Sequence, residues 1–262
     1  MRCGLALRLH CRNNPDEMNI PAPVLSLSHV SRRLSGNTIV EDLSLDVPRG
    51  VVLGLLGVNG AGKSTTLRMM VGMLTPSTGT VFVEGRDLAS HPQLARRGIG
   101  YLPEEPPLHG ELTVEEYLRF CARLHGIGRD KVHQAVEQAI ARCELGEMRH
   151  RLTSLLSKGF RQRVGLAQAI IHEPALIVLD EPASGLDPIQ ALRLRELMRS
   201  MAKDCAVVLS THVLSDVLAC CDRVAILHRG RLRKTAPLSE IAALESEFVR
   251  IASESPSMES AA

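Results

Sequence analysis

A glycine-rich segment at residues 57–64, with the sequence GVNGAGKS, constrains this chain more than any other feature. It matches the pattern G-x-x-x-x-G-K-[ST], in which backbone N–H groups and the start of a helix surround a phosphate group. The apolar run Val51–Leu56 precedes the segment, and a helical pattern from about Ser64 to Leu74 follows it. A buried strand, a phosphate-binding loop and a helix in this order predict a P-loop domain of the α/β class.

The polar groups of this loop have expected partners on a bound phosphate chain. The Lys63 ammonium would reach the outer phosphates, and the Ser64 hydroxyl would ligate Mg²⁺. The predicted phosphate-binding residues are Gly57, Asn59, Gly60, Ala61, Gly62, Lys63, Ser64 and Thr65.

The rest of the chain alternates between patterns typical of strands and of helices. After residue 175, three apolar runs of strand length are separated by helical patterns, which predicts a mainly parallel sheet. Residues 24–47 read as two strands joined by a turn, and we expect an antiparallel β part on this N-terminal side. Three successive helical patterns at about 105–173 predict a helical subdomain inserted into the α/β core.

Composition sets the limits of this domain and excludes some functions. We expect residues 1–22 and the Ser- and Glu-rich residues 246–262 to be disordered, which leaves 23–245 as the folded domain. Lys and Arg total 31 against 29 for Asp and Glu, so a net charge of +2 gives no global attraction to nucleic acid. No apolar stretch approaches the roughly 18 residues that would suggest a membrane span. The seven cysteines form no C-x-x-C pair and are expected to be free thiols.

Two carboxylates follow the apolar run Ala175–Leu179 directly. Open α/β sheets bind their ligands at the carboxyl ends of the strands, and this is where Asp180 and Glu181 are expected to lie. Asp180 would hold Mg²⁺ through water, and Glu181 would orient or deprotonate an attacking water. Ser157 suits the N-cap of a helix that begins near Gly159, and such a helix start favours an anion.

In their order along the chain, these segments resemble the nucleotide-binding domain of ABC transporters. The resemblance covers about Leu25 to Ile241, which is most of the chain. Residues 100–104 (GYLPE) and 157–163 (SKGFRQR) are most similar to ATPases of ABC-2-type exporters of the gliding-motility-like branch. The matching segments are Walker A at 57–65, a variant of the signature motif at 156–162, Walker B at 177–181, the D-loop at 184–187 and the switch histidine at His212.

The resemblance implies an ATPase that works as a pair, with each ATP held between the P-loop of one chain and the signature helix of the other. Ser157 and Gly159 would then bind the γ-phosphate of the partner's ATP, and Asp187 would lie across the interface. Glu181 and His212 would be catalytic. The implied cofactors are ATP and Mg²⁺. The implied partners are a second ATP-binding subunit, identical or homologous, and a transmembrane permease at the cytoplasmic face of the inner membrane, with no nucleic acid.

Four positions depart from the family pattern. Glu104 stands where most members carry Gln, and we expect it to ligate Mg²⁺ together with Ser64 and Asp180 while adding negative charge. Leu34 stands at the usually aromatic position that stacks on adenine, and its apolar contact would weaken nucleotide binding by about 1 kcal/mol. Lys158 and Phe160 replace the commoner residues of the signature motif.

Two other functions remain open on the sequence. A nucleotide-responsive module with weak or no hydrolysis is one, because Leu34 and Glu104 both depart from the pattern of active members. An ABC-type ATPase that acts on nucleic acid or ribosomes is the other. Such proteins usually need tandem copies or long coiled-coil insertions, and the sequence has neither.

Overall fold

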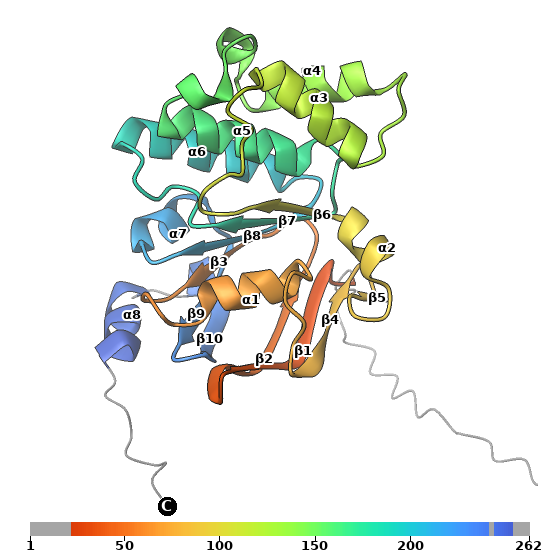
Figure 1. Ribbon diagram of the computed structural model, residues 1–262. Helices are drawn as coiled ribbons and strands as arrows, with labels where there is room; N and C mark the ends of the chain where they lie inside the picture. The colour runs from red at the N-terminus through yellow and green to blue at the C-terminus, as the bar shows by residue number, and fades with distance from the viewer. Residues whose placement is uncertain (1–21, 241–243, 254–262) are drawn as a thin grey trace, which may run out of the picture.

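The computed structural model describes residues 22–240 and 244–253 of the 262-residue chain. In Figure 1, a layer of helices lies over a six-stranded sheet, and a four-stranded sheet lies on its other side. Helix α1 (Lys63–Met70) lies between the two sheets. The expected disorder of residues 1–22 and of the chain end after residue 253 falls almost wholly outside the described residues.

The six-stranded sheet has the spatial order β10-β9-β3-β8-β7-β6. Each neighbouring pair from β9 to β6 is parallel, and β10 runs antiparallel to β9. The predicted mainly parallel sheet is therefore confirmed. Its strands are β3 Val52–Leu56, β6 Ile99–Leu102, β7 Leu176–Asp180, β8 Ala206–Thr211, β9 Arg223–His228 and β10 Arg231–Pro237.

The central strands β3, β7 and β8 are buried along their whole length. Side chains alternate between the two faces of a strand, so each face of the sheet needs its own apolar cover. Leu176 and Val178 of β7 pack in the core shared with α1 and the four-stranded sheet, whereas Ile177 and Leu179 pack in the core under the helical layer. This double burial explains why the strands read as continuous apolar runs.

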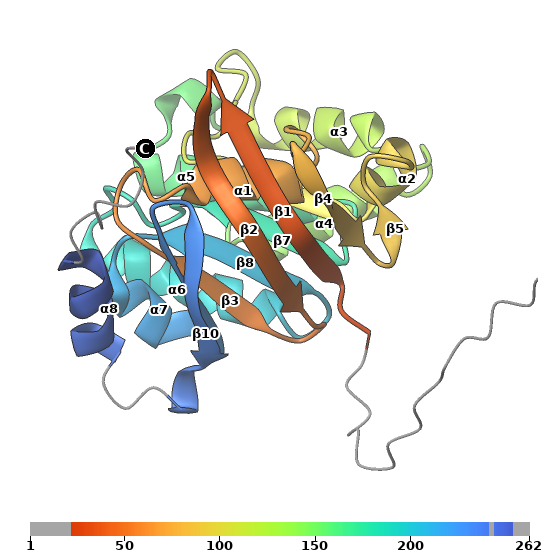
Figure 2. The ribbon, with the colours of Figure 1, turned by 90° about the horizontal axis from the view of Figure 1, so that it is seen from below.

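The four-stranded sheet confirms the predicted antiparallel β part on the N-terminal side and extends it to later residues. Its order is β2-β1-β4-β5, and all of its pairs are antiparallel. Seen from below in Figure 2, β1 and β2 are nearest the viewer, in front of α1 and the strands of the larger sheet. The strands are β1 Leu25–Leu34, β2 Asn37–Val47, β4 Thr78–Val83 and β5 Arg86–Asp87.

Three α-helices lie between β6 and β7, where the sequence predicts them. They are α3 (Val114–Leu124), α4 (Val132–Arg142) and α5 (Lys158–Ile170), with short 3₁₀ turns at Gly146–Met148 and Thr153–Leu155. A capping box starts α3: Thr113 Oγ1 accepts from Glu116 N–H, and the Glu116 carboxylate accepts from Thr113 N–H.

The remaining helices include two that the sequence reading missed, α2 and α8. The expectation of a disordered tail from residue 246 is wrong up to Ser253, because α8 buries Leu244 and Ile251 against the core. These two side chains lie about two helical turns apart and so share one face. No helix in the described part of the chain is long and apolar enough to cross a membrane. The helices are α2 Pro92–Arg97, α6 Pro188–Met201, α7 Leu214–Cys220 and α8 Leu244–Ser253, with a 3₁₀ turn at Leu238–Glu240.

Candidate functional site

The P-loop, His212, Asp180 and Glu104 lie at the ends of four neighbouring strands, in the order β3-β8-β7-β6. The P-loop follows β3, His212 follows β8, Asp180 ends β7 and Glu104 follows β6. Because the strands are parallel, these segments meet at one edge of the sheet. They border a cavity of about 640 Å³. Its lining residues are Ile39, Asn59, Gly60, Ala61, Gly62, Lys63, Ser64, Thr65, Glu104, Glu181, Ser184 and His212.

Two glycines allow the P-loop to fold tightly against neighbouring backbone. Gly62 has a φ of 100°, and a Cβ atom there would lie 2.9 Å from the Ile39 carbonyl oxygen. A Cβ atom at Gly57 would lie 2.5 Å from the Leu227 carbonyl oxygen. No side chain caps the start of α1, so its first N–H groups remain available to a phosphate.

The Lys63 ammonium lies at the centre of the site. Its side chain is only 6% exposed, and Nζ donates to the Gly57 carbonyl at 2.7 Å and approaches the Val58 carbonyl at 3.4 Å. Nζ also lies 3.2 Å from Glu181 Oε1. The P-loop thus holds a positive charge against the carboxylate that follows β7.

The Glu181 carboxylate joins Lys63 to the loop after β8. Its Oε2 atom lies 3.0 Å from His212 Nδ1, whereas its Oε1 atom is the one that approaches Lys63. Glu181 is 12% exposed and has a φ of 45°, in the left-handed region that residues other than glycine seldom adopt. Lys63, Glu181 and His212 therefore form one continuous chain of contacts.

The oxygen atoms beside the P-loop fit a magnesium ion. Ser64 Oγ lies 3.3 Å from Asp180 Oδ1, and Glu104 lines the same cavity. Hydroxyl and carboxylate oxygens are the ligands that Mg²⁺ prefers, usually together with phosphate and water. The described residues hold no cluster of three or more His, Cys, Asp or Glu that could bind a metal alone.

Ser157, Gly159 and Asp187 lie outside this cavity. Ser157 Oγ caps α5 by accepting from Phe160 N–H, and Asp187 Oδ1 caps α6 by accepting from two backbone N–H groups. Both residues therefore stand at the N-terminal end of a helix. Within one chain, the structure does not bring them to the P-loop.

Leu34 also lies outside the P-loop cavity, in a neighbouring cavity of about 770 Å³ that shares Thr65 with it. The rings of His125 and His172 stack there at 3.8 Å between centroids. Burial lowers the pKa of His172 to about 4, so this imidazole is neutral at physiological pH. The lining residues are Leu34, Thr65, Arg68, Met73, Leu74, Ile99, Tyr101, Pro103, Pro107, His125, Gln168 and His172.

Sequence reasoning missed three residues of the site. Ile39 and Ser184 line the P-loop cavity, and Ser210 hydrogen-bonds Asp180 from the adjacent strand. Ser184 stands in the D-loop segment already singled out, so a signal existed for it. Ile39 reaches the cavity from the other sheet, which no local pattern reveals.

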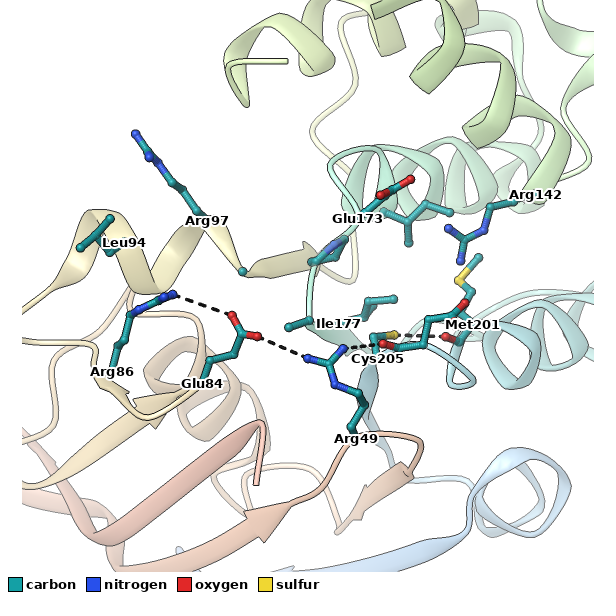
Figure 3. Close-up of a pocket in the computed structure, with 15 residues that line it drawn as sticks. Arg49, Glu84, Arg86, Leu94, Arg97, Arg142, Glu173, Ile177, Met201 and Cys205 are labelled. Atoms are coloured by element: carbon teal, nitrogen blue, oxygen red, sulfur yellow. Dashed lines mark hydrogen bonds and ion pairs between the residues drawn. The ribbon is translucent and has the colours of Figure 1, made fainter. Parts of the chain in front are cut away.

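A further cavity of about 750 Å³ lies at the opposite edge of the sheet, beside the amino ends of β6, β7 and β8 (Figure 3). Three of its charged groups lie close together. Arg49 and Arg86 both approach the Glu84 carboxylate, at 3.3 and 3.9 Å, and Arg49 also donates to the Asp204 carbonyl. None of the P-loop residues reaches it, so the cavity at the carboxyl ends is the candidate active site.

Fold and site together define a P-loop ATPase domain with an inserted helical subdomain. The family model described as "ABC transporter" matches residues 40–184, and the chain belongs to this family. It is therefore an ATP-binding subunit of an ABC transporter, and an ATPase.

Individual relatives agree with this assignment. The uncharacterized ABC transporter ATP-binding protein YxlF of Bacillus subtilis is 37% identical and covers 83% of this chain and 72% of its own. The Nod factor export ATP-binding protein I of Rhizobium meliloti is 37% identical over 81% of this chain and 64% of its own. A solved ATP-binding subunit of an ABC transporter superposes with a TM-score of 0.79 at 33% identity, covering 87% of this chain and 99% of that one.

Proposed function

We propose that this chain drives export through a separate transmembrane permease by binding and hydrolysing ATP as a dimer. The proposal is supported by one observation: within one chain, some of the predicted site residues lie together and others lie apart from them. Lys63, Glu181 and His212 contact one another around the P-loop cavity, whereas Ser157 and Asp187 stand apart from it. A second chain would bring its own helix starts to the open side of the cavity.

In this proposal one chain supplies the groups that bind the phosphates of ATP and also the groups that activate the attacking water. The P-loop N–H groups and the Lys63 ammonium bind the phosphates of ATP. Glu181 accepts a proton from the attacking water at its carboxylate, and His212 orients that carboxylate and contacts the γ-phosphate. Ser64, Asp180 and Glu104 would hold Mg²⁺, which when bound neutralises charge on the phosphates.

The partner completes the site from the other side of the γ-phosphate. Ser157 is exposed at the start of α5, and its weak cap bond of 3.5 Å to Phe160 N–H leaves the hydroxyl able to turn to a phosphate. The N-terminal end of α5 carries a partial positive charge, which favours an anion. Asp187 would contact the other chain from the start of α6.

The permease would dock on the cavity that contains Leu34. This cavity lies between the helical subdomain and the sheet, and its apolar residues and the neutral His172 offer a surface for an apolar helix. The named export function of the Nod factor relative supports the direction of transport. The protein would then act at the cytoplasmic face of the membrane.

A second candidate function is a nucleotide-responsive module with weak hydrolysis. Leu34 is 40% exposed and lies outside the P-loop cavity, and Glu104 adds a carboxylate to a cavity that already holds Glu181. Both features would weaken nucleotide binding without removing it.

The test of the proposed function is the ATPase rate of the purified chain over a wide range of protein concentration. If two chains form each site, the rate per chain rises with concentration until the dimer dominates. A rate per chain that stays constant down to the lowest concentration, with the mass of a monomer, would contradict the dimer. ATP binding with no hydrolysis at any concentration would favour the nucleotide-responsive module.

A further inference from the structure

Ser210 stands beside the two carboxylates of the site and has no part in the reaction proposed above. It is the residue before the last of β8, is fully buried, and pairs with Asp180 in the ladder between β7 and β8. We propose that Ser210 is a positioning residue that fixes both Asp180 and Glu181 through one hydroxyl group. This inference rests on the proposed roles of those two carboxylates.

The Ser210 hydroxyl makes two hydrogen bonds of opposite polarity. Its proton is donated to Asp180 Oδ1 at 2.7 Å, and its oxygen accepts from Glu181 N–H at 2.9 Å. A hydroxyl has one proton to donate and lone pairs to accept, so this single group satisfies both partners. An alanine or a valine at this position could satisfy neither.

The bond to Asp180 sets which carboxylate oxygen faces the P-loop. Asp180 Oδ1 receives hydrogen bonds from Ser210 and, at 3.3 Å, from Ser64. Two hydroxyls converge on one oxygen, which fixes the rotation of the carboxylate. Among the described residues, Oδ2 has no hydrogen bond, so it is available to the water shell of a metal ion.

The bond to Glu181 supports a backbone that is otherwise disfavoured. The ladder of β7 and β8 ends at the Asp180 and Ser210 pair. Beyond this pair, the Glu181 N–H donates to the Ser210 side chain instead of to a strand carbonyl. Glu181 then turns into the left-handed region, with a φ of 45°. This turn directs its carboxylate to Lys63 and His212, at 3.2 and 3.0 Å.

The test compares Ser210→Ala with Ser210→Thr, which keeps the hydroxyl, and with Thr153→Val as a matched control. Thr153 is also buried and donates its hydroxyl proton to a carbonyl, that of His109, but it lies in the helical subdomain. We expect kcat of Ser210→Ala to fall by about 10- to 100-fold, with ATP KM little changed, because outer-shell partners of a metal site have effects of this size. Ser210→Thr should recover most of this loss, and Thr153→Val should keep the wild-type kcat.

A second readout does not depend on hydrolysis. We measure the affinity of the non-hydrolysable analogue AMP-PNP in EDTA and again in Mg²⁺. For Ser210→Ala, the affinity in EDTA should equal that of the wild type, whereas the gain on adding Mg²⁺ should shrink by about tenfold. Thermal unfolding of all variants shows whether they are folded under the assay conditions.

The outcomes separate this inference from the proposed function. A wild-type kcat and a wild-type gain with Mg²⁺ in Ser210→Ala would overturn the role of Ser210 while leaving the ATPase intact. Equal losses in Ser210→Ala and Thr153→Val would also overturn it, because the effect would then be one of general stability. A wild-type protein that binds AMP-PNP without any effect of Mg²⁺ would contradict the proposed metal site itself, and the role of Ser210 with it.

Discussion

Lys63→Ala should weaken ATP binding by about 30- to 1000-fold, or about 2–4 kcal/mol, because it removes the buried positive charge of the P-loop. The Lys63 side chain is held among two loop carbonyls and Glu181. Its loss leaves the Glu181 carboxylate without its cation, close to where the phosphates would bind. The lost attraction between Lys63 and the phosphates and the repulsion between Glu181 and the phosphates therefore both weaken ATP binding.

Isothermal titration calorimetry with ATP measures this effect directly. Lys203→Ala is the matched control, since Lys203 is an exposed lysine after α6, far from the P-loop in the chain and outside its cavity. The control should bind ATP like the wild type. If Lys63→Ala also binds ATP with wild-type affinity while remaining folded, the assignment of the phosphate site is wrong.

Glu181→Gln should lower the rate of ATP hydrolysis by about 10²- to 10⁴-fold while ATP binding is retained. The amide keeps the shape of the side chain and can still contact Lys63 and His212, but it cannot accept a proton from water. If hydrolysis separates the two chains, the variant should also accumulate as an ATP-bound dimer. Single-turnover kinetics and light scattering in the presence of ATP measure the two effects.

Glu173→Gln is the matched control for this substitution. Glu173 is another non-glycine residue with a positive φ, of 55°, but it is exposed and lines the cavity at the opposite edge of the sheet. It should hydrolyse ATP at the wild-type rate. A Glu181→Gln variant that stays monomeric and hydrolyses ATP normally would refute the proposed role of Glu181 as the base.

The core of the fold could be predicted because its signals are local. The P-loop segment 57–64 specifies its own backbone, since Gly57 and Gly62 permit approaches that a Cβ atom would block. Asp180 and Glu181 were found because they end a continuous apolar run, and that run is continuous because both faces of β7 are buried. In each case a short stretch of sequence carries the physical cause.

The missed features depend on contacts between distant segments. Ser210 has no distinctive local pattern, and its role arises only because β8 pairs with β7 in a register that faces it to Asp180. Ile39 reaches the P-loop from the other sheet. The helix α8 was missed because it lies at the start of a Ser- and Glu-rich chain end, although Leu244 and Ile251 pack it against the core.

Leu34 lies beside the nucleotide site but outside the P-loop cavity. Its place in the family pattern predicts a contact with adenine, and the structure places it in the cavity next to the P-loop, with Thr65 between the two. The contact with adenine stays a prediction. Its position does connect the nucleotide site to the surface on which we propose that the permease docks.

The central claim is that each ATP lies between the P-loop of one chain and the α5 start of another, and mixing two inactive variants tests it most directly. Lys63→Ala disables the P-loop, and Ser157→Asp places a carboxylate against the partner's γ-phosphate while keeping a good N-cap residue for α5. In a mixed dimer, one site carries both defects and the other carries none.

Each variant alone should hydrolyse ATP at a small fraction of the wild-type rate. An equal mixture, allowed to exchange chains, should recover up to about a quarter of that rate, because half of the dimers are mixed and each has one intact site. A mixture no more active than the average of its two components would contradict the shared site.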